Sequence, residues 1–287
     1  MAKKALKLIG YPLEHSVSPN MQNAALKVLK LDNEFAYSLE PIKPEELRKK
    51  VTELKTTETA GFNVTIPYKE AIIPLLDEVD PTAQLIKAVN TVINKDGRLI
   101  GFNTDGPGFI ESLKKNRNAP DITGKNVMIL GAGGASRAVA VMLAAAGVKS
   151  ISISEIQAKK AHDLLKHISE NFNSVLTTFV EPNSAELQSA IDDAVLLVNT
   201  TPVGMTPNIE ASPLPENIKL HSNLFVYDLV YNPEETKLLK SAADCKGRAS
   251  GLEMLIQQGA LAFSIWTGKA APIETMRQAA KAALKLS

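Results

Sequence analysis

The chain has 287 residues, 45% of them hydrophobic and 22% charged, with a formal net charge of +1. This length provides for two ordinary domains, and the near balance of charge excludes a general electrostatic attraction to nucleic acid or to an anionic membrane. A single cysteine excludes an internal disulfide, and the four histidines lack zinc-ligand spacing. No apolar run approaches the roughly 18 residues of a membrane span, so we expect a cytoplasmic protein without a metal site.

Short apolar runs alternate with helical stretches over the first hundred residues. The elements expected there are a strand at 7–10, a helix from Ser18, a strand at 35–39, a helix at 44–54, a strand at 61–66 and a hairpin of 90–93 with 98–102. Ser18 and Pro19 predict the helix start, with serine as N-cap and proline at the first helical position. Asp96-Gly97 is a typical hairpin turn. The order indicates an α/β sheet that is mainly parallel with one antiparallel piece.

The second half has a more regular alternation of apolar strands and helices. A helix at 107–117 leads to expected strands at 127–130, 150–154, 175–179, 195–199 and 224–228, with helices at 137–146 and 158–171. Such alternation predicts a doubly wound, Rossmann-like sheet. Two final helices, at about 251–267 and 272–284, are apolar enough to pack against another part of the chain.

A glycine-rich turn follows the strand at 127–130 and opens a helix. Its residues are Gly131, Ala132, Gly133, Gly134 and Ala135. Glycines allow a tight turn and a close approach of the backbone to a pyrophosphate, whose charge the helix N-terminus favours. The turn therefore predicts a dinucleotide site, although a tight strand–helix connection without a ligand has the same outline.

Acid–base chemistry in this chain must rest on Lys, Asp, Glu or Tyr, because no histidine is suitably placed. Asn63 and Thr65 are two residues apart in an expected strand, so their side chains face the same side. Lys69 follows the proline that ends this strand and can turn back toward them. Asp105, at the end of the hairpin, is a candidate partner for Lys69 in a hydrogen-bonded ion pair.

Four motifs together resemble the shikimate dehydrogenase family, whose members are nicotinamide-dependent enzymes acting on small cyclic polyol acids. They are GFNVTIPYK at 61–69, NTV at 90–92, NTD at 103–105 and GAGGA at 131–135. The resemblance covers nearly the whole chain. It implies a substrate-binding and catalytic domain at 1–106, completed by returning C-terminal helices at 252–287, and a dinucleotide-binding domain at 107–251.

The resemblance also implies a role for each matching residue. Lys69 and Asp105 would be catalytic, with Lys69 as acid and base and Asp105 as its partner. Contacts to shikimate or 3-dehydroshikimate would come from Ser16, Ser18, Asn63, Thr65, Asn90, Tyr231 and Gln258. Cofactor contacts outside the glycine turn would come from Glu155, Thr201, Met205, Leu229, Gly251 and Met254.

The segment after the strand at 150–154 bears on the choice of cofactor. Family members that use NADP commonly carry Asn-Arg-Thr there, whereas this chain has Glu155, Ile156 and Gln157. A carboxylate can accept a hydrogen bond from the ribose 2′-OH and would repel a 2′-phosphate. We therefore expect NAD to be favoured over NADP, while noting that Lys159 and Lys160 could neutralise a phosphate.

Three other functions compete with a biosynthetic shikimate dehydrogenase. An NAD-dependent quinate/shikimate dehydrogenase of the catabolic branch is the nearest, and quinate would then be a substrate. A non-catalytic ligand sensor on the same fold is disfavoured because Lys69 and Asp105 are both present. A folate-interconverting dehydrogenase is disfavoured by the Ser-x-Ser-Pro and Asn-Thr-Asp motifs. The oligomeric state is left open between monomer and homodimer.

Overall fold

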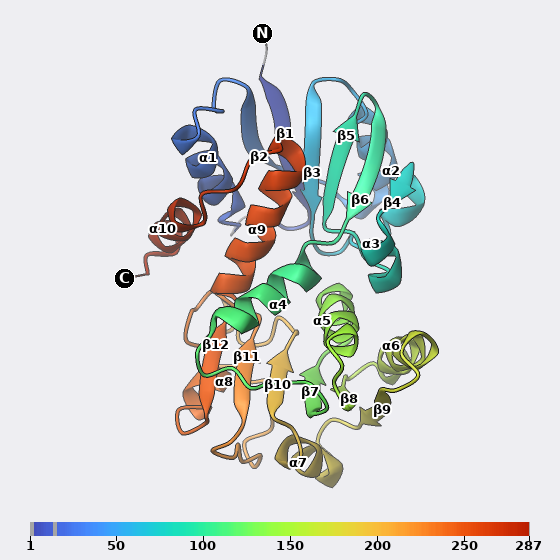
Figure 1. Cartoon of the computed structure of the whole chain (residues 1–287), viewed down its shortest axis with the longest axis vertical. Coiled ribbons are helices and arrows are strands. Elements are labelled where there is room, and N and C mark those ends of the chain that lie inside the picture. The colour runs from blue at the N-terminus through green and yellow to red at the C-terminus, as the bar shows by residue number, and fades with distance from the viewer. Residues whose placement is uncertain (1–2, 14–15, 287) are drawn as a thin grey trace. The chain divides into compact units, whose positions relative to one another are not determined.

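A computed structural model describes residues 3–13 and 16–286 of the chain. The chain divides into two compact units: the first runs to Gly108 and resumes at Leu255, and the second spans Phe109–Met254. Each contains a six-stranded sheet with helices around it (Figure 1). The prediction of an α/β chain with two mainly parallel sheets, and with C-terminal helices that join the first, is confirmed.

The first unit is a mixed sheet in the order β2-β1-β3-β5-β6-β4. Its strands are β1 (Lys4–Gly10), β2 (Phe35–Pro41), β3 (Thr59–Val64), β4 (Glu78–Val79), β5 (Thr91–Lys95) and β6 (Arg98–Phe102). β5 runs antiparallel to both β3 and β6, while the other pairs are parallel. The antiparallel piece is the hairpin that Asp96-Gly97 predicted, and Asp96 has the positive φ that such a turn requires.

The helices of the first unit come from both ends of the chain. They are α1 (Ser18–Val28), the short 3₁₀ turns η1 (Pro44–Glu46) and η2 (Ile73–Leu75), α2 (Leu47–Glu53), α3 (Pro81–Ile86), the C-terminal part of α9 (Leu252–Thr267) and α10 (Ile273–Leu284). α10 packs on α1. α9 is fixed to the sheet by Trp266, whose indole N–H donates to Val92 O over 2.9 Å.

The second unit is a wholly parallel sheet in the order β12-β11-β10-β7-β8-β9. Its strands are β7 (Asn126–Leu130), β8 (Ser150–Ser154), β9 (Leu176–Val180), β10 (Leu196–Asn199), β11 (Phe225–Asp228) and β12 (Gly247–Ser250). Its helices are α5 (Gly134–Ala145), α6 (Ala158–Asn171), α7 (Ala185–Asp192) and α8 (Lys237–Ser241). α4 (Asp105–Lys115) begins in the first unit and continues into the second.

The central strands of the second sheet are continuous apolar runs because helices cover both faces of a parallel sheet. One of the buried clusters on this sheet contains Met128, Leu130, Leu187, Ile191, Leu197, Val226 and Leu238. The carboxyl ends of these strands carry the loops in which a doubly wound fold binds its ligand. Among the described residues, no helix is both long and apolar enough to cross a membrane.

Candidate active site and dinucleotide site

Lys69 and Asp105 form a short, largely buried ion pair in the first unit. Lys69 Nζ lies 2.6 Å from Asp105 Oδ2, and the two side chains are only 16% and 9% exposed. Lys69 follows a turn after β3, and Asp105 is the first residue of α4, where the helix dipole favours a carboxylate. The pair therefore places an ammonium and a carboxylate together where water has limited access.

Asn90 holds the other oxygen of the Asp105 carboxylate. Its Nδ2 donates to Asp105 Oδ1 over 2.8 Å and to Thr104 Oγ1 over 2.9 Å, and its Oδ1 accepts from Thr104 N over 2.7 Å. Gln258 Oε1, on α9, lies 3.5 Å from Asn90 Nδ2 and from Thr104 Oγ1. Two hydrogen-bonded neighbours thus orient Asp105, and α9 brings Gln258 to the same cluster.

Asn63 lies beside this cluster but is occupied by other protein groups. Its amide nitrogen donates to Asn90 O over 3.1 Å and to Thr91 Oγ1 over 3.0 Å, and its Oδ1 accepts from Tyr37 Oη over 2.7 Å. It is 7% exposed. Both of its amide hydrogens are therefore committed within the protein, and one lone pair of Oδ1 remains. Thr65 lies just beyond the end of β3 and is half-buried.

Ser16 and Ser18 lie at the N-terminus of α1, where an anion is favoured by the helix dipole. The expected N-cap at Ser18 is wrong, because the helix begins at Ser18 and its N-cap residue is Val17. Ser16 Oγ accepts from Ser18 N over 3.3 Å, so the serine two residues earlier meets the first helical N–H. Pro19 was predicted to be the first helical residue, and the observed start of α1 at Ser18 differs from that prediction by one residue.

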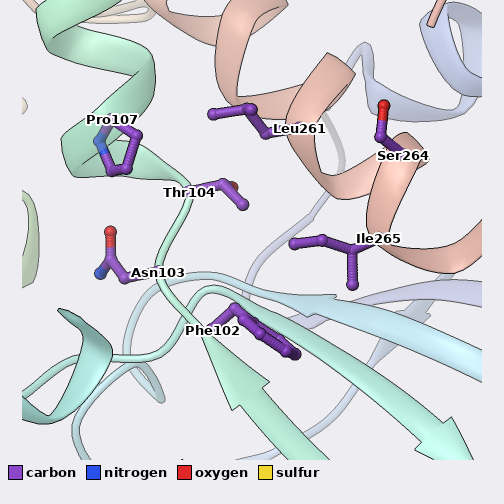
Figure 2. Close-up of a pocket in the computed structure, with 7 residues that line it drawn as sticks. All are labelled: Phe102, Asn103, Thr104, Pro107, Leu261, Ser264 and Ile265. Atoms are coloured by element: carbon purple, nitrogen blue, oxygen red, sulfur yellow. The ribbon is translucent and has the colours of Figure 1, made fainter. Parts of the chain in front are cut away.

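A pocket of about 370 Å³ lies next to this polar cluster in the first unit. Figure 2 shows Leu261 and Ile265 of α9 pointing toward Phe102 and Thr104 across it. Its remaining lining residues are Asn103, Pro107 and Ser264. Thr104 also belongs to the Asn90 network, whereas Asn103 is used by the fold, donating to Ala88 O and accepting from Gly106 N.

The glycine turn of the second unit has the shape that a pyrophosphate requires. Gly131 has a φ of +102°, which other residues rarely adopt, and a Cβ there would meet Thr200 Oγ1 at 2.8 Å. A Cβ on Gly133 would have nothing within 4 Å, so open space lies beside the backbone at the start of α5. Open backbone at a helix N-terminus fits the phosphates of a dinucleotide.

Both carboxylate oxygens of Glu155 accept hydrogen bonds from backbone N–H groups. Oε2 accepts from Ala132 N over 3.0 Å, and Oε1 accepts from Gln157 N over 2.9 Å. The side chain therefore connects the end of β8 to the glycine turn. Ile156, the next residue, is 85% exposed.

The other predicted cofactor residues lie at the carboxyl ends of β10, β11 and β12. Thr201 donates through both N and Oγ1 to Asn199 Oδ1, over 3.0 and 2.7 Å. Gly251 N donates to Val230 O over 3.0 Å, beside Leu229, and Met254 is buried. Met205, in contrast, is exposed. Tyr231 belongs to this second unit, and burial raises the pKa of its phenol.

Three residues to which the sequence assigned no role are central to this region: Asn199, Asp228 and Thr236 are all buried, and the Asp228 carboxylate accepts a hydrogen bond from each of the other two. The sequence signal that could have identified them was an Asp at the end of an apolar strand. This signal is weak, because Asp is also a common residue in ordinary turns. The parallel sheet, its strand order and its glycine turn define a Rossmann-like domain, the fold class in which dinucleotides bind at the carboxyl ends of the strands.

Comparisons with known proteins place nearly the whole chain in one family. Residues 8–92 match the family model described as the shikimate dehydrogenase substrate binding domain, 113–210 match shikimate / quinate 5-dehydrogenase, and 251–281 match the shikimate 5'-dehydrogenase C-terminal domain. The chain belongs to the shikimate dehydrogenase family, as the sequence motifs predicted.

Individual relatives agree over nearly the full length. The chain is 42% identical over 273 residues to a protein of Alkaliphilus metalliredigens named shikimate dehydrogenase (NADP(+)), covering 94% of each. A protein of Methanopyrus kandleri with the same name is 44% identical over 273 residues, covering 95% of this chain and 93% of its own. The Thermus thermophilus shikimate 5-dehydrogenase in complex with NADP(H) and shikimate is 39% identical, with a TM-score of 0.84 and coverage of 98% and 99%.

The predicted preference for NAD over NADP is wrong. Both relatives just described are named as NADP(+) enzymes, and the Thermus structure contains NADP(H). The prediction treated Glu155 as a free acceptor for a ribose hydroxyl. In the structure both of its oxygens already accept backbone N–H groups, so its presence at the strand end has a structural explanation that is independent of the cofactor.

Proposed function

We propose that this chain is a shikimate dehydrogenase that interconverts 3-dehydroshikimate and shikimate with NADP(H). The observation that carries the proposal is the Lys69–Asp105 pair, 2.6 Å apart and largely buried, in a chain of this family. The first unit would bind the substrate and the second the cofactor. When bound, the nicotinamide supplies or accepts the hydride at the substrate's C3.

Lys69 would handle the proton that accompanies the hydride. In reduction, the Nζ ammonium donates a proton to the ketone oxygen as it becomes a hydroxyl. In oxidation, the neutral amine takes that proton back as general base. Asp105 would keep Lys69 in place, and Asn90 would hold Asp105, because its Nδ2 donates to the carboxylate oxygen that Lys69 leaves available.

The remaining polar groups of the first unit would recognise the substrate. Ser16 and Ser18 offer hydroxyls at the N-terminus of α1, which suits the carboxylate. Gln258 adjoins the catalytic pair and suits the ring hydroxyls. Asn90 would act on the substrate mainly through Asp105, because its amide hydrogens already bond Asp105 and Thr104. Asn63 would contribute mainly by supporting Asn90 and Thr91, because its amide hydrogens are used there, and Thr65 would add a hydroxyl.

The 2′-phosphate of NADP would need cations near the end of β8. Lys159 and Lys160 are exposed in the first turn of α6, one helical turn beyond Glu155. Lys159 is 3.7 Å from Asp163, a loose and exposed pair that would cost little to break. We propose that these two lysines serve the 2′-phosphate in place of the family's arginine, with the positive end of α6 beside them.

The test is to measure kcat/KM from the absorbance of the reduced cofactor, with shikimate or quinate and with NADP⁺ or NAD⁺. We expect turnover of shikimate with NADP⁺, at least tenfold more efficient than with NAD⁺, which corresponds to about 1.4 kcal/mol. Efficient quinate oxidation would reassign the substrate within the family. A folded protein that turns over neither acid with either cofactor would overturn the proposed activity.

Replacing Ser16 with alanine should raise KM for shikimate by about 10- to 100-fold and change kcat little, because a hydrogen bond to a charged group contributes about 1.5–3 kcal/mol. Steady-state kinetics with varied shikimate at saturating NADP⁺ measures this. Ser38→Ala, at an exposed position of β2 in the same unit, is the control. An unchanged KM in Ser16→Ala would remove Ser16 from the carboxylate site.

A further inference from the structure

Asp228 is a fully buried carboxylate in the second unit that the proposed chemistry does not use. It ends β11 and is 0% exposed. Oδ1 accepts from Asn199 Nδ2 over 2.9 Å and from Val230 N over 3.0 Å, while Oδ2 accepts from Thr236 Oγ1 over 2.6 Å. Thr236 Oγ1 in turn accepts from Leu239 N at the start of α8, so the direction of its own proton is fixed toward Asp228.

Burying a carboxylate in this way costs free energy of folding, so its presence calls for a reason beyond stability. Burial raises the pKa of the Asp228 carboxyl, and its three hydrogen-bond donors are all neutral. A buried carboxylate held only by neutral donors stabilises a fold less than an apolar side chain of similar size would. What the carboxylate provides is acceptor capacity in three directions at once, which neither Asn nor an apolar residue supplies.

The three donors lead to three different segments at the carboxyl edge of the sheet. Asn199 opens the 199–205 loop, and with its Nδ2 on Asp228 its Oδ1 is turned toward Thr201, accepting from Thr201 N and Oγ1. Val230 lies in the 229–231 segment, and its carbonyl accepts from Gly251 N. Thr236 connects the same carboxylate to α8.

These are the segments that carry the expected contacts to the nicotinamide half of the cofactor, namely Thr201, Leu229 and Gly251. We propose that Asp228 is a positioning residue for that half-site: it touches no cofactor atom and sets the amide orientation of Asn199 and the path of 229–231. This inference rests on the proposed dinucleotide function of the second unit.

The first test is Asp228→Asn, read by calorimetric titration of NADP⁺ without substrate. The amide of Asp228→Asn has one acceptor oxygen and one donor nitrogen, whereas both oxygens of the Asp228 carboxylate accept. If the new nitrogen faces Thr236, the Thr236 hydroxyl must turn its proton away or lose its hydrogen bond. We expect Kd for NADP⁺ to rise at least tenfold, a change of about 1.4 kcal/mol in binding free energy, and kcat to fall. KM for shikimate, measured at saturating NADP⁺, should stay within about threefold of the wild-type value.

A second pair of variants keeps the inference testable if Asp228→Asn does not fold. Thr236→Val removes one donor to Asp228 while keeping the side-chain shape, and Thr236→Ser restores that donor. We expect Thr236→Val to weaken NADP⁺ binding and Thr236→Ser to return Kd to within about twofold of the wild type. Equal Kd values in Thr236→Val and the wild type would overturn the inference.

The matched control is Ser112→Ala, which breaks the buried 2.7 Å hydrogen bond between Ser112 Oγ and Tyr227 Oη in the same unit. Tyr227 precedes Asp228 in β11 and points to the opposite face, so this variant should lower Tm without changing Kd. If Asp228→Asn lowers Tm in the same way and leaves Kd unchanged, its role is only structural. Failure of the proposed activity can be distinguished from failure of this inference, because it would appear in the wild type as absent turnover despite measurable NADP⁺ binding. A wild type that binds no dinucleotide would overturn the inference.

Discussion

Replacing Lys69 with alanine is expected to lower kcat by a factor of about 10²–10⁴, the usual contribution of a positioned acid–base group. The pair with Asp105 is 2.6 Å long, and we propose that no other side chain supplies the proton. Removing the ammonium should also leave the Asp105 carboxylate without its cation. KM for shikimate should change much less than kcat. Steady-state kinetics in both directions would measure both parameters.

The control for this variant is Lys55→Ala. Lys55 also forms an ion pair in the first unit, at 2.9 Å from Asp77, but it is more exposed and outside the Asn90 cluster. Its loss should leave kcat near the wild-type value and cost at most about 1 kcal/mol of stability, as is usual for surface pairs. Normal turnover by Lys69→Ala would withdraw Lys69 from proton transfer.

Replacing Gly251 with alanine should damage both the fold of the second unit and its cofactor affinity. A Cβ at this position would lie 1.9 Å from Leu229 O and 2.5 Å from Leu229 C, both backbone atoms that cannot turn away. Relieving that clash requires the 229–231 segment to move. We expect the free energy of unfolding to fall by about 3 kcal/mol, at the upper end of ordinary overpacking costs.

Urea unfolding measures the loss of stability in Gly251→Ala, and titration with NADP⁺ measures the loss of affinity. Ser250→Ala, one residue earlier at a half-buried position, should be close to the wild type in both. If Gly251→Ala retains wild-type stability and affinity, the close approach of Gly251 to Leu229 is not a constraint on the site.

The second sheet was largely predictable because its strands are uninterrupted apolar runs between helices, such as 127–130 and 224–228. β12 was missed, since Gly247-Arg-Ala-Ser250 is short and carries a charge. α7 was also missed, because a helix of eight residues gives only two turns of periodicity. Sequence patterns therefore identified five strands of the sheet, including the edge strand β9, and missed the short polar strand at its other edge.

In the candidate site, the proximity of Lys69 and Asp105 was predicted and is present. Residue type alone did not reveal which side chains are already hydrogen-bonded to other groups of the protein. Glu155 was interpreted as a ribose acceptor, yet it is bonded to two backbone N–H groups. Asp228 was assigned no role, although Leu229 and Tyr231 of the same segment were, because a polar residue at a strand end looks the same in sequence whether it is exposed or completely buried.

The first unit is assembled from the two ends of the chain, with 109–254 inserted between them. During synthesis, β1 to β6 leave the ribosome long before α9 and α10, and domains generally fold as units. The sheet face to which Trp266 docks, and the side of α1 that α10 covers, stay open to solvent until α9 and α10 emerge. The second unit, which is continuous, can finish first. A nascent chain of this protein would therefore complete its second unit before its first.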